Sequence, residues 1–195
     1  MFFNLSKALK DQVSIEEIEK GLNQLSPEDR VEQSRSLGPS QQKQLWQLCE
    51  GRKVSLDQLV PADRVGQTVR HLGRNTLPAF KIFEKHFLRP SKDHEVLWGF
   101  NEGPTRKLVG PGYFVARNSD QTEIGNVVID YEMLPEEAPQ GWPKIKSNET
   151  GVSRLVYAFM HDYLRQVSEH VTIGRAYRKG KESPNYFTLC RWDGE

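Results

Sequence analysis

Apolar residues recur at helical spacing through the first 90 residues of the chain. The first set follows at intervals of three and four: Ile15, Ile18, Leu22 and Leu25. This spacing predicts an amphipathic helix over residues 14–25, with Ser14 as its N-cap. Ser26 and Pro27 begin a second predicted helix, which ends before Gly38 because glycine commonly follows the last helical residue.

Three more short helices are predicted before residue 90. Residues 40–50 contain Leu45, Leu48 and Cys49, residues 62–72 contain Val65, Val69 and Leu72, and residues 77–88 contain Phe80, Phe83 and Phe87. Each set lies on one face of a helix, and a glycine or a proline ends each segment. The spacing therefore predicts an N-terminal bundle of short helices over residues 1–90.

After residue 95 the pattern changes to the alternation typical of half-buried strands. One face carries Val127, Ile129, Tyr131 and Met133, and the other carries Val128, Asp130 and Glu132. Residues 113–117 are the predicted antiparallel partner of this strand. Residues 171–178 and 186–192 form a second predicted hairpin, with Pro184 in its turn and outside the ladder. Residues 97–100 add a fifth strand.

The strongest predicted helix lies between the two hairpins, over residues 153–167. Its apolar residues form a wide stripe: Leu155, Val156, Phe159, Met160, Tyr163, Leu164 and Val167. Such a stripe needs a covering surface, which a sheet supplies. The sequence thus predicts an α+β fold with an N-terminal short-helix bundle (1–90), followed by an antiparallel sheet packed on one long helix (91–195). The two regions form separate domains or one continuous domain.

Composition excludes some classes of protein without assigning a function. Lys and Arg number 27 against 26 Asp and Glu, so no net field attracts the chain to nucleic acid, which we do not expect as a partner. Cys49 and Cys190 lie far apart in apolar stretches, which predicts buried thiols and a reducing, cytoplasmic compartment. No apolar run has the length of an export signal or a transmembrane segment.

We expect neither a metal nor a cofactor from the sequence. The five histidines are His71, His86, His94, His161 and His170. No two of them have the four-residue spacing that places both imidazoles on one face of a helix. The glycines match no nucleotide-binding motif. Asp130 and Glu132 share one strand face, but their alternation with apolar residues predicts that this face is in solvent.

The leading functional hypothesis is a non-catalytic binding module. It holds a small, partly apolar anionic ligand or peptide in a cleft between the sheet and the long helix. Residues 134–152 form a long loop with Trp142 as its lid. The loop leads to Ser153 and Arg154, where helix N–H groups and a guanidinium favour an anion. Alternatively, Trp142 only pins the loop and Ser153 only caps the helix.

Tyr157, His161 and Arg165 extend the candidate ligand-binding set along the predicted helix. Their four-residue intervals place them in one row, which can bind an anion. With His161 and Tyr157 as candidate catalytic groups, the row can also move a proton, so an acid–base enzyme is a further hypothesis. The competing interpretation, which we favour, is that the three residues only border the core.

The distribution of charge gives a second interaction hypothesis. Residues 64–92 contain seven basic residues and one acid, a net charge of +6, whereas residues 93–151 contain five basic and ten acidic residues, a net charge of −5. The candidate anionic-surface residues are Arg64, Arg70, Arg74, Lys81, Lys85 and Arg89. The basic segment either docks on an acidic protein or anionic surface or neutralises the acidic segment within one molecule. The nearly equal totals favour neutralisation.

Overall fold

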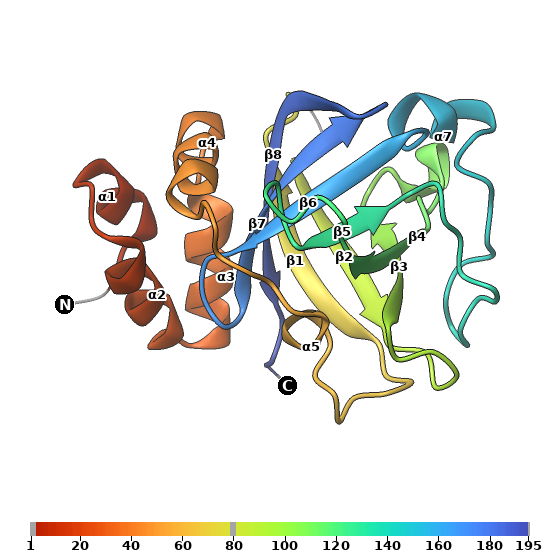
Figure 1. The fold of residues 1–195 in the computed structure, drawn as a ribbon, viewed down its shortest axis with the longest axis horizontal. Helices are drawn as coiled ribbons and strands as arrows, with labels where there is room; N and C mark the ends of the chain where they lie inside the picture. The colour runs from red at the N-terminus through yellow and green to blue at the C-terminus, as the bar shows by residue number, and fades with distance from the viewer. Residues whose placement is uncertain (1–2, 79–80, 195) are drawn as a thin grey trace.

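The structure, a computed structural model, describes residues 3–78 and 81–194. Within these residues, eight strands each pair antiparallel with the next, and the first pairs with the last to close a barrel (Figure 1). The strands are β1 (Val69–Asn75), β2 (Ile82–Leu88), β3 (Val96–Glu102), β4 (Phe114–Asn118), β5 (Val127–Asp130), β6 (Met160–Gln166), β7 (Val171–Arg178) and β8 (Lys181–Arg191). Closure leaves no unpaired sheet edge.

The predicted α+β fold is wrong, because the structure contains no long helix packed on a sheet among the described residues. The segment predicted as one helix over 153–167 divides into α7 (Gly151–Val156) and strand β6. Phe159, with a φ of 60°, lies between them. Strand β6 is buried on both faces, by the barrel interior and by the N-terminal helices. A strand covered on both faces carries apolar residues without alternation, which resembles a helical stripe.

The helices predicted over 62–72 and 77–88 are also wrong, because residues 62–68 form turns and irregular backbone, β1 begins at Val69, and β2 occupies residues 82–88. The misleading signal was a spacing of four residues, as between Phe83 and Phe87. Four is an even number, so the two residues share one face of a strand as well as one face of a helix. Both side chains face the barrel interior. Phe80, which also belonged to this predicted helix, lies outside the described residues.

The other predicted elements are confirmed. Ser14 caps α2 (Ile15–Asn23), Ser26 caps α3 (Pro27–Ser36), and α4 (Pro39–Leu48) follows. Strand β3, the β4–β5 hairpin and the β7–β8 hairpin are also present, but β5 ends at Asp130, before Tyr131 and Met133. Three short helices had not been predicted: α1 (Leu5–Lys10), α5 (Leu56–Leu59) and α6 (Arg106–Val109).

The turn of the β7–β8 hairpin is shorter than predicted. Lys179 and Gly180 both have positive φ, the conformation of a tight two-residue turn, and Arg178 pairs with Lys181 across it. Pro184 therefore lies within β8, not in the turn. It falls between two paired positions where the register shifts, so the missing N–H occurs at an irregular part of the ladder.

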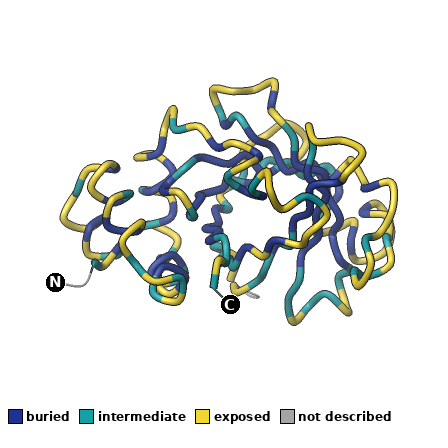
Figure 2. The backbone as a smooth tube through the Cα atoms, turned by 90° about the horizontal axis from the view of Figure 1, so that it is seen from below, coloured by how far each residue is buried: buried dark blue, intermediate teal, exposed yellow. Residues whose placement is uncertain are grey.

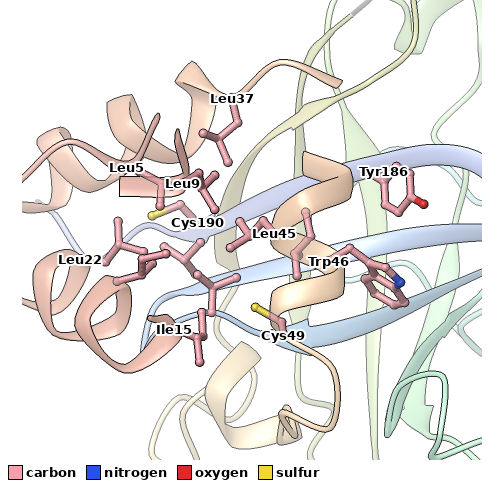
Figure 3. Packing of buried hydrophobic residues seen from close by; sticks show 14 of the residues in the cluster. Leu5, Leu9, Ile15, Leu22, Leu37, Leu45, Trp46, Cys49, Tyr186 and Cys190 are labelled. Carbon is pink, nitrogen blue, oxygen red and sulfur yellow. The ribbon is translucent and has the colours of Figure 1, made fainter. Parts of the chain in front are cut away.

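Helices α3 and α4 lie against the outer face of the barrel at β7, β8 and β1, and α1 packs on α3 and α4 (Figure 1). Exposed positions concentrate in turns and on outer helix faces (Figure 2). Apolar side chains of the helices meet those of β7 and β8 in one core (Figure 3). Trp46 of α4, for example, lies 6.3 Å from Tyr186 of β8 between ring centroids. Cys49 and Cys190 are free and buried in this core, as predicted.

The barrel itself has a second core, which closes one of its two ends. Val54, Leu56, Leu59 and Val60, in and around α5, pack against the inward side chains of the strands. Figure 1 shows α5 at one end of the barrel, with α7 and the tip of the β7–β8 hairpin at the other. None of the described helices has the length and apolar character needed to cross a membrane.

Candidate binding cavity

A cavity of about 250 Å³ lies inside the barrel, among the residues of its end opposite α5. Its walls are mainly apolar and include Leu77, Ile82, Phe83, Val109, Met160, Ala176 and Phe187. Polar side chains also line it, and four of them are buried and form one group: Lys85, Asn101, Tyr131 and Asp162. The others include Asn75, Glu102, Thr105, Arg106 and Asn185. An apolar cavity with a few converging polar groups is the usual form of a small-molecule site. Among the described residues no long helix packs on a sheet, so the predicted cleft is not formed there, and this cavity is the alternative.

Strand alternation brings the polar group together inside the barrel. Lys85 of β2 lies between Phe83 and Phe87, which share its inward face. Lys85 is directly opposite Asn101 of β3 in the register. Asp162 of β6 is opposite Ile129 of β5, so it also points inward. Lys85 and Asn101 come from consecutive strands, whereas Asp162 comes from a distant one and lies near Lys85 because the strands form a barrel.

The ammonium of Lys85 contacts three acceptors. Its Nζ donates to Asn101 Oδ1 at 2.9 Å, to Asp162 Oδ2 at 3.3 Å and to the hydroxyl of Tyr131. The rings of Phe114 and Tyr131 each lie with their centroids 5.0 Å from Nζ, close enough for cation–π attraction. Three acceptors match the three protons of an ammonium, so the geometry favours the charged form.

Burial disfavours both charges of the pair. Desolvation lowers the pKa of Lys85 and raises the pKa of Asp162, and the attraction between the two groups opposes both shifts. Desolvation also raises the pKa of Tyr131 well above its usual value, and the Asp162 charge adds to this effect. Tyr131 therefore remains a neutral hydroxyl that bridges the lysine and the carboxylate.

One oxygen of the Asp162 carboxylate has no hydrogen-bond donor among the described residues. This atom, Oδ1, is buried. Asn101 has already used its amide, which donates to Gly112 O at 2.9 Å and to the Tyr131 hydroxyl at 3.3 Å. A buried acceptor without a donor costs free energy, so Oδ1 is the unsatisfied atom of a residue that lines the cavity.

The predicted ligand-binding residues do not converge on this cavity. Tyr157 lines it and stacks on Tyr131 at 5.4 Å between centroids. Trp142 instead lies on the outer face of the barrel against Phe100, and its Nε1 donates to Thr68 Oγ1 at 2.8 Å.

The other two predicted anion ligands lie on α7. Ser153 donates its hydroxyl to Val109 O, and the structure shows no side-chain cap at the start of α7. Arg154 is exposed. Binding at these residues stays a prediction.

The remaining two predicted residues belong to the outer face of β6. Arg165 stacks on Trp46, with its guanidinium carbon 4.0 Å from the ring centroid, and donates to the Trp46 carbonyl. His161 Nε2 lies 3.3 Å from Asp130 Oδ1 and 3.6 Å from Glu132 Oε2. Adjacent strand residues point to opposite faces, so His161 is separated from Asp162 by the barrel wall. Acid–base chemistry at His161 therefore has no access to the barrel cavity.

His161, Asp130 and Glu132 bring three possible metal-ligand atoms within 4.8 Å of one another. The Arg117 guanidinium already donates to Asp130 Oδ2 at 3.0 Å, and a cation in this place repels a metal ion. Ion pairing explains the cluster without a metal. It also buries Asp130, whereas Glu132 stays exposed, as predicted for this strand face.

The Asp130 cluster predicts a loss of stability in acid. Burial raises the pKa of Asp130, but hydrogen bonds from His161 and Arg117 outweigh this effect and lower it from 3.8 to about 2. A lowered folded-state pKa stabilises the protein above pH 3.8, and this stabilisation is lost as the pH falls towards 2. We expect a contribution of about 2 kcal/mol, measured as the free energy of unfolding between pH 6 and pH 2.

Asp130→Asn should lack this part of the pH dependence, whereas the control Asp63→Asn, at an exposed position, should retain it. An Asp130→Asn profile parallel to that of the unsubstituted protein would contradict the assignment.

The basic residues predicted as an anionic surface have different environments. Lys85 is inside the barrel, and Arg89 is buried, where it pairs with Asp57. Arg70 pairs with Glu84, and Arg74 donates to the carbonyl of Arg35. Lys81 and Arg64 are exposed. Docking through this segment stays a prediction, but two of its six residues are buried.

Comparison with known proteins does not identify a relative: no family model matches the sequence, and no curated protein or solved structure matches it. The fold and the cavity are therefore the basis of the functional argument.

The sequence contained a signal for the Lys85–Asp162 pair that becomes visible only once the strands are known. In the segment from Ile82 to Leu88, Lys85 shares a face with Phe83 and Phe87. A lysine on the apolar face of a strand is buried and needs an acceptor. The helical interpretation concealed this, because in a helix Lys85 leaves the Phe83–Phe87 stripe.

Proposed function

We propose that the barrel binds one small, mainly apolar molecule whose polar end donates a hydrogen bond to Asp162. The observation that carries the proposal is the buried, unpartnered Oδ1 of this cavity-lining residue. The apolar part of the ligand contacts the cavity walls, including Phe83, Ala176 and Phe187. Lys85 and Tyr131 hold the carboxylate in place, because both donate to Oδ2.

The size of the cavity limits the ligand. A volume of about 250 Å³ is larger than the roughly 150 Å³ cavity that accepts benzene, and smaller than the roughly 300–1,000 Å³ of drug-sized pockets. A medium-chain alcohol or a small phenol fits this range. The ligand is neutral in this proposal, because the lysine is already paired and a ligand carboxylate would face Asp162.

The test is a calorimetric titration with 1-octanol and with its isomer heptyl methyl ether. The two have the same atoms, but only the alcohol has a donor. A hydrogen bond to a charged group contributes about 1.5–3 kcal/mol, so we expect the alcohol to bind at least tenfold more tightly. Equal affinity for the two molecules would contradict the role of Asp162.

A pair of variants tests the location of the site. Ala176 is buried and lines the cavity, so Ala176→Phe fills the space and should abolish octanol binding. The control Ala62→Phe adds the same ring at an exposed position and should bind like the unsubstituted protein. Circular dichroism checks that both variants are folded. Normal octanol binding by folded Ala176→Phe would exclude the cavity as the site.

Octanoate distinguishes the proposal from the anion site predicted at Ser153, Arg154 and Trp142. We expect octanoate to bind more weakly than octanol, because its carboxylate repels Asp162. Tighter binding of octanoate, lost in Arg154→Ala, would contradict the proposal and support the site on α7.

A further inference from the structure

Apolar side chains are exposed around the end of the barrel opposite α5, where the cavity lies. Six of the nine large apolar side chains that are exposed among the described residues belong to this end: Leu77, Ile82, Leu108, Val152, Leu155 and Val156. The two most exposed are Leu108 of α6, at 72%, and Leu155 of α7, at 75%. We refer to these six residues as the mouth rim. Clustered exposure of this kind indicates an interaction surface.

The rim is one surface, because its segments contact one another. Leu77, Ile82 and Val156 line the same cavity. Helices α6 and α7 are in contact, and Ser153 of α7 donates to the carbonyl of Val109 in α6. Arg178 of the β7–β8 hairpin donates to the Leu155 carbonyl at 2.8 Å. The hairpin tip and α7 lie at the same end of the barrel in Figure 1.

Basic side chains surround the rim. Those exposed on the same segments are Lys81, Lys107, Arg154, Arg178, Lys179 and Lys181. The exposed acids on these segments are Glu149 and Glu182, and Glu182 is paired with Arg175. Glu132, beside His161, is a third exposed acid at this end. The charge of this end is therefore positive, although the whole chain is nearly neutral. Apolar residues within a basic border are the surface that an anionic bilayer attracts and accepts.

We infer that this end of the barrel docks on an anionic lipid bilayer, with Leu108 and Leu155 inserted among the lipids. The basic side chains then contact the headgroups, and the cavity opens towards the apolar layer. We choose a bilayer because the exposed apolar residues come from separate segments, α6, α7 and the start of β2, that surround the cavity. A mainly apolar ligand passes between bilayer and barrel without crossing bulk water.

The test is co-sedimentation of the full chain with vesicles of phosphatidylcholine alone or mixed with phosphatidylglycerol. We expect binding to the anionic vesicles, weakened by salt. Leu108→Ser with Leu155→Ser should reduce this binding more than tenfold, and Lys107→Glu with Lys179→Glu should reduce it to a similar extent. All four side chains are exposed or lie in turns, so the variants should remain folded.

Matched controls lie on the helices far from the mouth. Leu48→Ser removes an exposed leucine of α4, and Lys10→Glu reverses an exposed charge of α1. Both should bind vesicles like the unsubstituted protein. Absence of binding to anionic vesicles would overturn the inference, as would binding that the rim variants do not change. No ligand is present in the measurement, so its outcome is independent of the octanol titrations.

Discussion

Asp162→Leu alone is expected to lower the free energy of unfolding by about 3–5 kcal/mol, because it leaves the ammonium of Lys85 buried without its counter-charge. The side chains of Lys85 and Asp162 are 3% and 5% exposed, so both charges are removed from bulk water. Lys85→Met should have a similar cost, because it leaves the carboxylate unpaired. Equilibrium unfolding in urea measures both.

The double variant Lys85→Met with Asp162→Leu should recover most of this loss. Replacing both charges by apolar groups of similar size removes the desolvation cost along with the attraction. A double-mutant cycle therefore gives a coupling of several kcal/mol. The control is Lys7→Met at the exposed Lys7–Asp11 pair, which should change stability by less than about 1 kcal/mol. Additive effects of the two barrel substitutions would contradict a buried ion pair.

Gly174→Val should be the second strongly destabilising substitution. A Cβ at this position would lie 2.1 Å from Cζ of Phe187, whose ring fills the barrel interior. Either the ring or the strand must move, which costs about 1–3 kcal/mol in a packed core. Thermal and urea unfolding give the change in stability.

Phe187→Leu in the Gly174→Val background should restore part of the stability, because it opens the space that the new side chain needs. The control is Gly103→Ala, where the nearest atom to the new Cβ is 3.8 Å away, and we expect a change within about 0.5 kcal/mol. Unchanged stability in Gly174→Val would show that the ring does not occupy this position.

The elements that could be predicted are those whose signals lie within a few residues of one another along the chain. Ser14 and Ser26 cap their helices because a serine hydroxyl accepts from a backbone N–H in the first turn. Val127 and Ile129 lie on one face of the predicted strand, and both belong to β5. Such signals are contained in a short segment, so a single sequence is sufficient to detect them.

Closure of the barrel could not be predicted, because it depends on pairing between β1 and β8, which lie more than 100 residues apart. The same distance explains why the cavity was missed. Lys85 and Asp162 both lie in segments that were interpreted as helices. Neither residue indicates a site by itself, because the site depends on the contact between the two side chains. Trp142 was the more visible candidate because a tryptophan in a long loop is unusual, yet its ring packs outside the barrel against Phe100.

The most direct test of the central claim, that the ligand site is the interior of the barrel, is a map of backbone amide chemical shifts during titration with 1-octanol. We expect the largest shifts at cavity positions such as Phe83, Ala176 and Phe187. Shifts concentrated at Trp142 and Arg154, with the interior strands unchanged, would contradict the claim.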